Sequence, residues 1–317
     1  MTTESVPTIS VIIPCYNDGA YLRESVNSVL VQQGEFLLSE VVVVDDGSDD
    51  AATLDALSNL SDDPRVLTLP NEEPKGPGGA RNTGVRHASG DWIVFLDADD
   101  VFCEDSIAAR VRAAGQFPES RWIGADFVLW HEDGSLDEES FFTTRSRPRK
   151  WIERAIVSGQ PMVLSRPVDE FIDGPPTNMC CTMVKKDLID EVGGFDPSQR
   201  LQQDYHLFVR LAHRSDFVFV PQVVMHYRQH GGNSTQSSVN TLRWRETACR
   251  KLLADAAFAP YSKALKRKIA EICLQVSTAF STARSHLPAF GAAIRGVRIQ
   301  PGSAENWKRL LATMVLR

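Results

Sequence analysis

The sequence has no run of apolar residues that approaches the roughly 20 needed to cross a bilayer. Its opening, MTTESVPTIS, also lacks the basic start and apolar stretch of a secretory signal peptide. These absences argue against an integral membrane protein and against a secreted one. We therefore expect a cytoplasmic protein, or one that is peripheral on the inner face of the cell membrane.

Cysteine is scarce and has no functional pattern. The chain has six cysteines, and they form no CxxC pair and no spacing typical of metal ligands. The adjacent Cys180 and Cys181 fit a strand of small residues better than a disulfide framework. This usage favours a reducing compartment.

The chain as a whole has no excess of basic over acidic residues. Its 34 Lys and Arg residues against 41 Asp and Glu residues give a net charge of −7, which argues against a nucleic-acid partner. The charge is nevertheless uneven, because residues 241–317 contain 14 Lys or Arg and 4 Asp or Glu, a balance of +10. The sequence therefore combines an acidic body with a basic tail.

What is present is an alternation of strand and helix patterns. Short runs of β-branched and apolar residues predict buried strands, and stretches with apolar residues on one helical face separate them. The expected strands of the first half are 9–13, 41–44, 66–69 and 92–96, and the expected helices are 21–32, 54–60 and 80–88. This order predicts an α/β fold with a mostly parallel central sheet and helices on both faces.

The second half continues the pattern with weaker signals. Strands are expected at 127–130, 180–184, 217–220 and 223–227, and helices at 187–192 and 204–213. The rest of the chain is expected to be helical, with apolar stripes at Leu265, Ile269, Ile272, Val276 and Phe280 and at Trp307, Leu310, Leu311, Met314 and Val315. We therefore expect an α/β domain over 1–240 and a helical C-terminal appendage over 241–317.

Three of the expected strands end in polar residues. These ends read Pro14-Cys15-Tyr16-Asn17, Asp45-Asp46 and Asp97-Ala98-Asp99-Asp100. Ligands of open α/β sheets bind beyond the carboxyl ends of the strands, so we expect the three ends to meet at one site. Isolated acids after strands often start turns or cap helices. Asp97 and Asp99 are different, because like charges crowded at one strand end are unfavourable without a cation.

Five blocks of the sequence together match a known pattern. They read ISVIIPCYNDGAYLRESVNSVLVQ, VVVVDDGSDD, GPGGARNTGVRHASGDWIVFLDADD, GGFDPSQRLQQDYHLFVRLA and HYRQHGGNS. In this order and spacing they resemble the inverting family 2 glycosyltransferases of the GT-A fold, over about residues 7–234. A single Asp-x-Asp motif would carry no weight, because it recurs by chance. The resemblance implies that residues 1–240 form a nucleotide-sugar glycosyltransferase domain of GT-A type.

The resemblance also implies a donor site at the first strand ends. Pro14 and Tyr16 would flank the nucleotide base, and Asp45 would accept a hydrogen bond from the imide of that base. Uracil and thymine both carry an imide N–H, so this carboxylate favours a UDP- or dTDP-sugar as the donor. The reaction would transfer a hexosyl or deoxyhexosyl group with inversion at the anomeric carbon.

A metal site beside the donor is implied in the same way. Asp99 would bind Mn²⁺ or Mg²⁺ directly, since hard divalent cations favour carboxylate oxygens, and His230 would be a second ligand. Asp97 would hold the ribose or a metal-bound water. Arg81 and Arg228 would contact the donor. The metal would neutralise charge on the leaving diphosphate.

Asp204 is the residue that the resemblance makes the general base. A positioned carboxylate takes the proton of the acceptor hydroxyl while its oxygen attacks the anomeric carbon. The family usually has Glu-Asp at this point, whereas this chain has Gln203-Asp204. The replacement of Glu by Gln203 puts in doubt the contact that this Glu would make with the acceptor. It leaves the expected base, Asp204, in place.

The sequence names neither the sugar nor the acceptor. A glycan and a lipid-linked acceptor of polysaccharide or cell-envelope synthesis both fit. The basic, apolar-striped tail fits either a contact with an anionic membrane or packing in a homodimer. Two other functions stay open, a catalytically silent sugar-nucleotide binding module and a sugar nucleotidyltransferase. The second would be expected to have a Gly-rich loop with Lys after its first strand, where this chain has PCYND.

Overall fold

The computed structural model describes residues 6–60, 62–144, 149–231 and 238–315. The chain forms two compact units. Unit 1 consists of Met1–Pro167, Pro176–Ser198 and Arg210–Gly232, and unit 2 of Val168–Pro175, Gln199–Val209 and Asn233–Arg317. The domain boundary expected near residue 240 stays a prediction.

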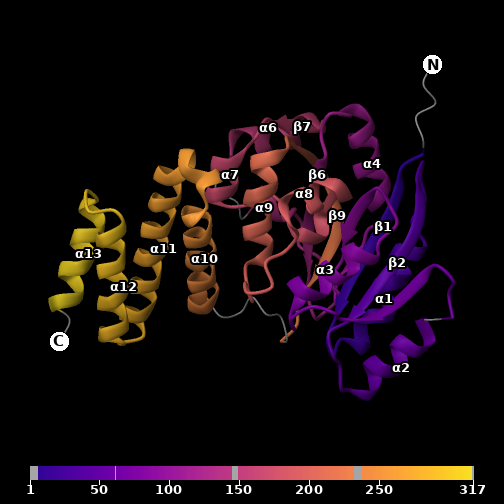
Figure 1. Cartoon of the computed structure of the whole chain (residues 1–317), viewed down its shortest axis with the longest axis horizontal. Helices are drawn as coiled ribbons and strands as arrows, with labels where there is room; N and C mark the ends of the chain where they lie inside the picture. Colours follow the sequence, from indigo (N-terminus) through magenta and orange to yellow (C-terminus); the bar gives the residue numbers. More distant parts are fainter. Residues whose placement is uncertain (1–5, 61, 145–148, 232–237, 316–317) are drawn as a thin grey trace. The chain divides into compact units, whose positions relative to one another are not determined.

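Unit 1 is built on one nine-stranded sheet (Figure 1). Its strands are β1 (Thr8–Cys15), β2 (Leu37–Asp45), β3 (Val66–Pro70), β4 (Trp92–Phe95), β5 (Val101–Phe102), β6 (Trp122–Trp130), β7 (Met162–Leu164), β8 (Thr182–Lys185) and β9 (Phe217–Arg228). Neighbouring strands follow the order β3-β2-β1-β4-β8-β6-β9-β5, and β7 pairs with β9. The first four are mutually parallel, while β8 is antiparallel to both of its neighbours.

The central strands of the sheet are buried on both faces, which explains their continuous apolar sequences. Residues 11–13 of β1 and 41–44 of β2 are fully buried. A strand covered on both faces needs an apolar side chain at every position rather than at alternate ones. The expected α/β fold of GT-A type, with a mostly parallel central sheet and a helical C-terminal region, is confirmed.

The helices of unit 1 pack against this sheet. They are α1 (Gly19–Leu30), α2 (Ala51–Leu60), α3 (Pro77–His87), α4 (Ser106–Gln116), α5 (Phe141–Thr144), α6 (Lys150–Ser158) and α8 (Lys186–Val192). Helix α3 contacts β1 and β2 most closely. A Cβ atom on Gly84 would lie 2.4 Å from Cγ2 of Ile12, so the glycine is what lets this helix approach the strand.

Unit 2 is helical in its described residues. It contains α7 (Val168–Asp173), the first part of α9 (Gln203–Arg214), α10 (Ser238–Ala254), the 3₁₀ helix η3 (Ala256–Tyr261), α11 (Ser262–Thr282), α12 (His286–Ile299) and α13 (Ala304–Val315). Helices α10 to α13 pack side by side in chain order (Figure 1). The apolar stripe of α11 faces inward, with Leu265, Ile269 and Val276 fully buried.

Among the described residues, no helix is both long enough and apolar enough to span a membrane.

Several expected strands have different bounds in the structure. The strands expected at 217–220 and 223–227 are one strand, β9, whose pairing with β6 shifts around Asp126. Pro221 has no N–H to donate to the ladder, so the strand bulges there instead of ending. The strand expected from Cys180 begins only at Thr182, because residues 179–181 form the 3₁₀ helix η1 (Met179–Cys181). The side chain of Asn178 caps η1 by accepting a hydrogen bond from the N–H of Cys180.

Candidate active site

The carboxyl ends of β1, β2 and β4 are neighbours in unit 1. Cys15 at the end of β1 pairs with Asp45 at the end of β2. The N–H of Asp46 donates to the carbonyl of Cys15 (2.8 Å), and the N–H of Leu96 donates to the carbonyl of Ile12 (3.0 Å). The polar residues that follow these strands therefore belong to one edge of the sheet, as expected.

Arg81 of α3 forms an ion pair with the first acid of the Asp-Ala-Asp motif. Its Nη2 lies 2.5 Å from Oδ1 of Asp97. The side chain of Arg81 is 5% exposed, against 35% for Asp97. The guanidinium is thus largely withdrawn from water while the carboxylate keeps an accessible side. An ion pair of this kind fixes the orientation of the carboxylate.

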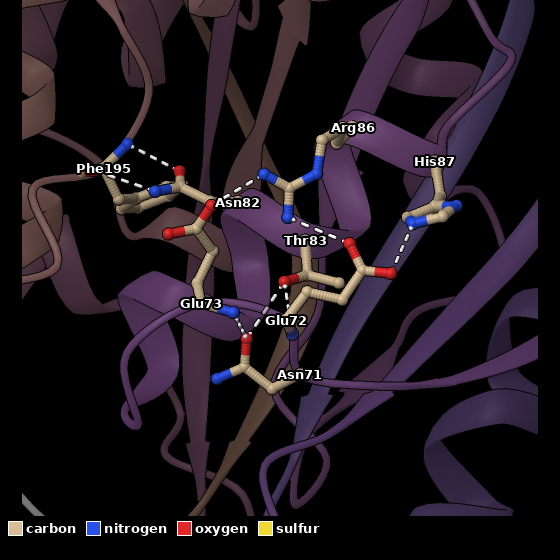
Figure 2. Close-up of polar contacts among 8 residues, drawn as sticks. All are labelled: Asn71, Glu72, Glu73, Asn82, Thr83, Arg86, His87 and Phe195. Atoms are coloured by element: carbon tan, nitrogen blue, oxygen red, sulfur yellow. Dashed lines mark hydrogen bonds and ion pairs between the residues drawn. The ribbon is translucent and has the colours of Figure 1, made fainter.

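Side chains of helix α3 tie it to two loops, as Figure 2 shows. Asn82 donates to the carbonyl of Phe195 (2.9 Å) and accepts from its N–H (2.8 Å). Arg86 pairs with Glu73 at 2.6 Å. The first set of contacts attaches the helix to the turn after α8, and the second attaches it to the loop after β3. Both restrict the helix position, and with it the position of Arg81.

The second acid of the motif, Asp99, is hydrogen-bonded to His230. Nε2 of His230 lies 2.8 Å from Oδ2 of Asp99, and the two side chains are 18% and 22% exposed. Burial raises the pKa of Asp99, and the charge of Asp97 raises it further, against the opposing effect of His230. The structure thus brings together the two residues expected to bind the metal.

Asp100 is the most deeply buried acid of this loop. It is 1% exposed, and its Oδ1 accepts the N–H of Arg228 (2.9 Å). Its Oδ2 is buried and has no hydrogen-bond partner among the described residues. Burial, then Asp99 and Asp97, raise the pKa of Asp100 well above its ordinary value.

A thiol completes this cluster. Sγ of Cys180 and one carboxylate oxygen each of Asp97 and Asp100 lie within 4.8 Å of one another. Sγ also accepts the N–H of Asp97 at 3.3 Å. The buried thiol is protonated at neutral pH, because burial raises the pKa of Cys180 well above its ordinary value.

Arg228, at the end of β9, holds the same loop from the other side. Its Nε donates to the carbonyl of Asp99 (2.8 Å), and its Nη2 pairs with Glu24 of α1 (2.5 Å). The guanidinium carbon lies 3.9 Å from the ring centroid of Trp130 and 4.7 Å from that of Tyr21. With two rings and three oxygen partners around it, counting the contact of its N–H with Asp100, Arg228 is anchored to the protein.

The residues expected at the nucleotide base differ in how exposed their side chains are. Pro14 is buried within β1, whereas Tyr16 is 44% exposed and has Nζ of Lys75 3.8 Å from its ring centroid. Oδ1 of Asp45 accepts the N–H of Ser48 (3.0 Å). The accessible ring of Tyr16 could stack on a planar base.

Sequence reasoning missed several residues of this site. Asp46 orders the loop before α3, since its oxygens accept from Asn71 (2.6 Å) and from the N–H of Gly76 (2.8 Å). Asp18 accepts the N–H of Tyr16 (3.2 Å). Burial raises the pKa of Asp18, and nearby Asp99 and Asp97 raise it further. The position of Asp18, directly after the strand end Pro14-Cys15-Tyr16-Asn17, could have identified it from sequence as a residue of this site.

Taken together, the donor set of this edge fits a divalent cation. Several carboxylates share this edge. Burial and the charge of Asp97 raise the pKa of both Asp99 and Asp100, and Asp99 also raises that of Asp100. The buried Oδ2 of Asp100 has no hydrogen-bond partner in the part of the chain that the structure describes. Carboxylate oxygens with one imidazole nitrogen are ligands that Mn²⁺ accepts, and the oxygens alone suit Mg²⁺.

Asp204 belongs to unit 2 and lies in the first turn of α9. Its side chain is partly buried, and Oδ1 accepts the N–H of Tyr205 at 2.8 Å. The expected role of this residue as general base stays a prediction. Residues 232–234, which end the last of the five matching blocks, lie outside the described residues.

Comparison with known proteins agrees with this geometry. The model of the family described as "Glycosyl transferase family 2" matches residues 10–170, just over half of the chain. A glycosyltransferase of Rickettsia prowazekii, RP339, is 26% identical over 238 residues, covering 74% of this chain and 68% of that protein. The succinoglycan biosynthesis protein ExoO of Rhizobium meliloti is 38% identical over 111 residues, covering 35% of this chain and 31% of ExoO.

Among solved structures, residues 1–349 of S. aureus TarS in complex with UDP-GlcNAc superpose with a TM-score of 0.62 at 17% identity. The match covers 92% of this chain and 81% of that one. A longer TarS structure superposes equally well, and there the chain spans only 49% of its length. These structures share the GT-A fold, and the family model covers most of the sheet and the Asp-Ala-Asp loop. The chain therefore belongs to glycosyl transferase family 2.

Proposed function

We propose that this protein is an inverting glycosyltransferase that moves a sugar from a UDP- or dTDP-sugar to an acceptor hydroxyl, with a divalent metal at the Asp-Ala-Asp loop. The observation that carries the proposal is the contact of Asp99 with His230 at the edge where β1, β2 and β4 end. In a family 2 chain, this edge is where the donor diphosphate would bring its negative charge. A hexosyl or deoxyhexosyl group is the transferred sugar in this proposal.

Asp99 and His230 would hold the metal, Mn²⁺ or Mg²⁺. When bound, such an ion acts as a Lewis acid that neutralises charge on the leaving diphosphate. Arg81 keeps Asp97 oriented through its ion pair, so that the accessible side of Asp97 can bind the ribose or a metal-bound water. Arg228 was expected to contact the diphosphate, and its contacts with Asp99 and Glu24 support a role in holding the loop.

Pro14 and Tyr16 would flank the donor base, with the base stacked on the ring of Tyr16 and Asp45 as the hydrogen-bond acceptor for the imide. The exposed ring of Tyr16 supports this placement. The TarS structure with UDP-GlcNAc supports a uridine nucleotide as the donor class for this fold. A UDP-sugar is therefore the first donor to test, and a dTDP-sugar the second.

Asp204 would act as the general base. The acceptor hydroxyl gives its proton to this carboxylate while the oxygen forms a bond to the anomeric carbon and the bond to the diphosphate breaks. Attack from the side opposite the diphosphate inverts the anomeric configuration. One protein carboxylate is enough for this reaction, which is why Gln203 in place of the usual Glu is compatible with it.

The acceptor in this proposal is a glycan or a lipid-linked sugar, as in polysaccharide or cell-envelope synthesis. The likeness to the succinoglycan biosynthesis protein ExoO over 111 residues supports this class. Such a reaction takes place in the cytoplasm or at the inner face of the cell membrane. Peripheral membrane contact and a homodimer are both compatible with it.

The proposal is tested by incubating the full chain with UDP-sugars and dTDP-sugars, with either Mn²⁺ or a chelator, and measuring release of the nucleoside diphosphate. We expect release with Mn²⁺, and its loss with the chelator and in Asp99→Ala. A protein that is stabilised by the donor and releases nothing with any acceptor would instead be a silent binding module. Release of pyrophosphate from a nucleoside triphosphate and a sugar phosphate would identify a nucleotidyltransferase.

A further inference from the structure

The last described helix, α13, packs on its neighbours with its more polar side. Asn306, Leu310 and Thr313 are 4%, 8% and 5% exposed. Nδ2 of Asn306 donates to the carbonyl of Gly296 in α12 (3.3 Å). Arg309 donates from Nη2 to the carbonyl of Ser277 in α11 (2.8 Å). The contacts that fix α13 thus combine hydrogen bonds with the packing of Leu310 against Ala293 and Val297 of α12.

The large apolar side chains of α13 face outward. Trp307, Leu311 and Met314 are 47%, 59% and 55% exposed. Their spacing of four and three residues places them on one side of the helix. A helix that served only to cover the helical stack would be expected to turn these side chains inward and its amide and hydroxyl groups outward. Of the stripe expected from sequence, only Leu310 packs inward, and the side chain of Val315 lies outside the described residues.

We call Trp307, Lys308, Leu311 and Met314 the α13 face. A stripe of large exposed apolar side chains with a cation beside it is typical of an interaction surface. The stripe is too short and too charged at its edge to enter a bilayer as a span. Its geometry is that of a helix that lies in the plane of a membrane interface.

Exposed cations occur near this face in the sequence. Arg284, Arg298 and Lys308 are exposed, and in the described part of the chain none of the three has a carboxylate partner. Between residues 284 and 315 the only acid is Glu305. The buried Glu246, by contrast, neutralises Arg250 and Arg295 elsewhere in the unit. Residues 284–315 therefore carry an excess of basic over acidic residues, and Lys308 belongs to the α13 face itself.

We propose that the α13 face binds an anionic lipid surface. Trp307, Leu311 and Met314 enter the headgroup region, and the exposed cations meet the lipid phosphates. A second copy of this chain is a weaker occupant. In a symmetric pair the α13 face of one copy would meet the α13 face of the other. The basic residues of the two copies would then be brought together, with only Glu305 of each copy to offset their charge. An anionic membrane supplies both the apolar layer and the opposite charge.

The experiment is sedimentation of the full chain with vesicles of phosphatidylcholine alone and with vesicles that also contain phosphatidylglycerol. We expect binding to the anionic vesicles that weakens with added salt, and little binding to the neutral ones. The combined variant Trp307→Ser, Leu311→Ser, Met314→Ser should lose binding to the anionic vesicles. Lys308→Gln should bind them about fivefold more weakly, the usual effect of one interfacial cation.

The matched control is Val157→Ser, which removes an apolar side chain that is 88% exposed on α6 of unit 1. It should sediment like the parent protein. Thermal unfolding of each variant checks the fold, which should be unchanged because every substituted side chain is exposed. Equal sedimentation of the parent and the combined variant, or of the parent with both kinds of vesicle, overturns the proposal. A dimer that the combined variant loses, without any lipid binding, would assign the face to a second copy.

Discussion

Nε2 of His230 lies 2.8 Å from Oδ2 of Asp99, although the two residues are 131 positions apart in the sequence. Arg228 strengthens this link, because its side chain donates to the carbonyl of Asp99 and its N–H to Asp100. The end of β9 and the loop after β4 are thus joined by several side-chain contacts, one of which links the two residues proposed to bind the metal. Changes at either segment should therefore affect metal binding.

The first prediction concerns Asp99. UDP with Mn²⁺ should stabilise the parent protein by about 2.7 kcal/mol when ligand is present at ~100 times its dissociation constant. Asp99→Ala should lose most of that gain, because it removes the carboxylate proposed to bind the metal. Thermal shift with and without Mn²⁺ measures the effect. Asp190→Ala, which removes an exposed acid of α8, is the control, and an equal shift in Asp99→Ala would refute the metal assignment.

The second prediction concerns the choice between metals. An imidazole nitrogen is a better ligand for Mn²⁺ than for Mg²⁺, so His230→Ala should weaken Mn²⁺ binding by about tenfold or more and affect Mg²⁺ less. Metal titration followed by calorimetry in the presence of UDP gives both affinities. His226→Ala is the matched control, since this half-buried imidazole packs near Trp130 and has no contact with Asp99 in the described residues. Equal losses for the two metals would remove His230 from the ligand set.

Several parts of this site could be predicted from sequence, because they depend on short patterns within a few residues of one another. The strand ends carry their acids directly after buried apolar runs, so Asp97 and Asp99 could be placed on a parallel sheet edge without knowing the rest of the fold. The family resemblance added His230, which no local pattern would join to Asp99. The buried strands β1 and β2 were predicted for the same local reason, because both faces of the sheet are covered.

Other features depend on tertiary contacts that periodicity does not record. The side of α13 that packs inward combines the hydrogen bonds of Asn306 and Arg309 with the packing of Leu310, while the rest of the described apolar stripe is exposed. The raised pKa of Asp100 depends on its burial, in a loop that Arg228 holds in place. Sequence reasoning therefore found most of the acids of the site. It named Arg81 and Arg228 as donor contacts, but it did not find their contacts with Asp97 and Asp99.

The third prediction concerns the general base. Asp204→Asn should bind the donor like the parent protein and lose sugar transfer by roughly 10² to 10⁴-fold, the usual contribution of a positioned base. Donor binding by calorimetry and transfer to the acceptor measure the two effects separately. Gln203→Glu restores the family's usual neighbour and should leave transfer at a similar level. Normal turnover by Asp204→Asn would mean that another group takes the proton.

The last prediction uses the raised pKa of Asp100 in the metal-free protein. Burial first, then Asp99 and Asp97, disfavour the ionised carboxylate in the folded state. The folded state therefore holds this proton more tightly than the unfolded state, where the pKa is near the ordinary value of 3.8. The stability that this difference contributes is complete below that value, and it is lost as the pH rises through the raised pKa of the folded state.

Asp100→Asn removes this titration and keeps an oxygen that can accept the N–H of Arg228. In the presence of a chelator, its free energy of unfolding relative to the parent should therefore increase from pH 4 to neutral pH, by about 1 kcal/mol or more. Urea unfolding at several pH values measures the difference, with Asp190→Asn as the exposed control that should show no trend. Added Mn²⁺ with UDP should shrink or reverse the advantage, because a bound cation offsets the buried charge only in the parent. A difference that does not change with pH would show that Asp100 carries no such penalty.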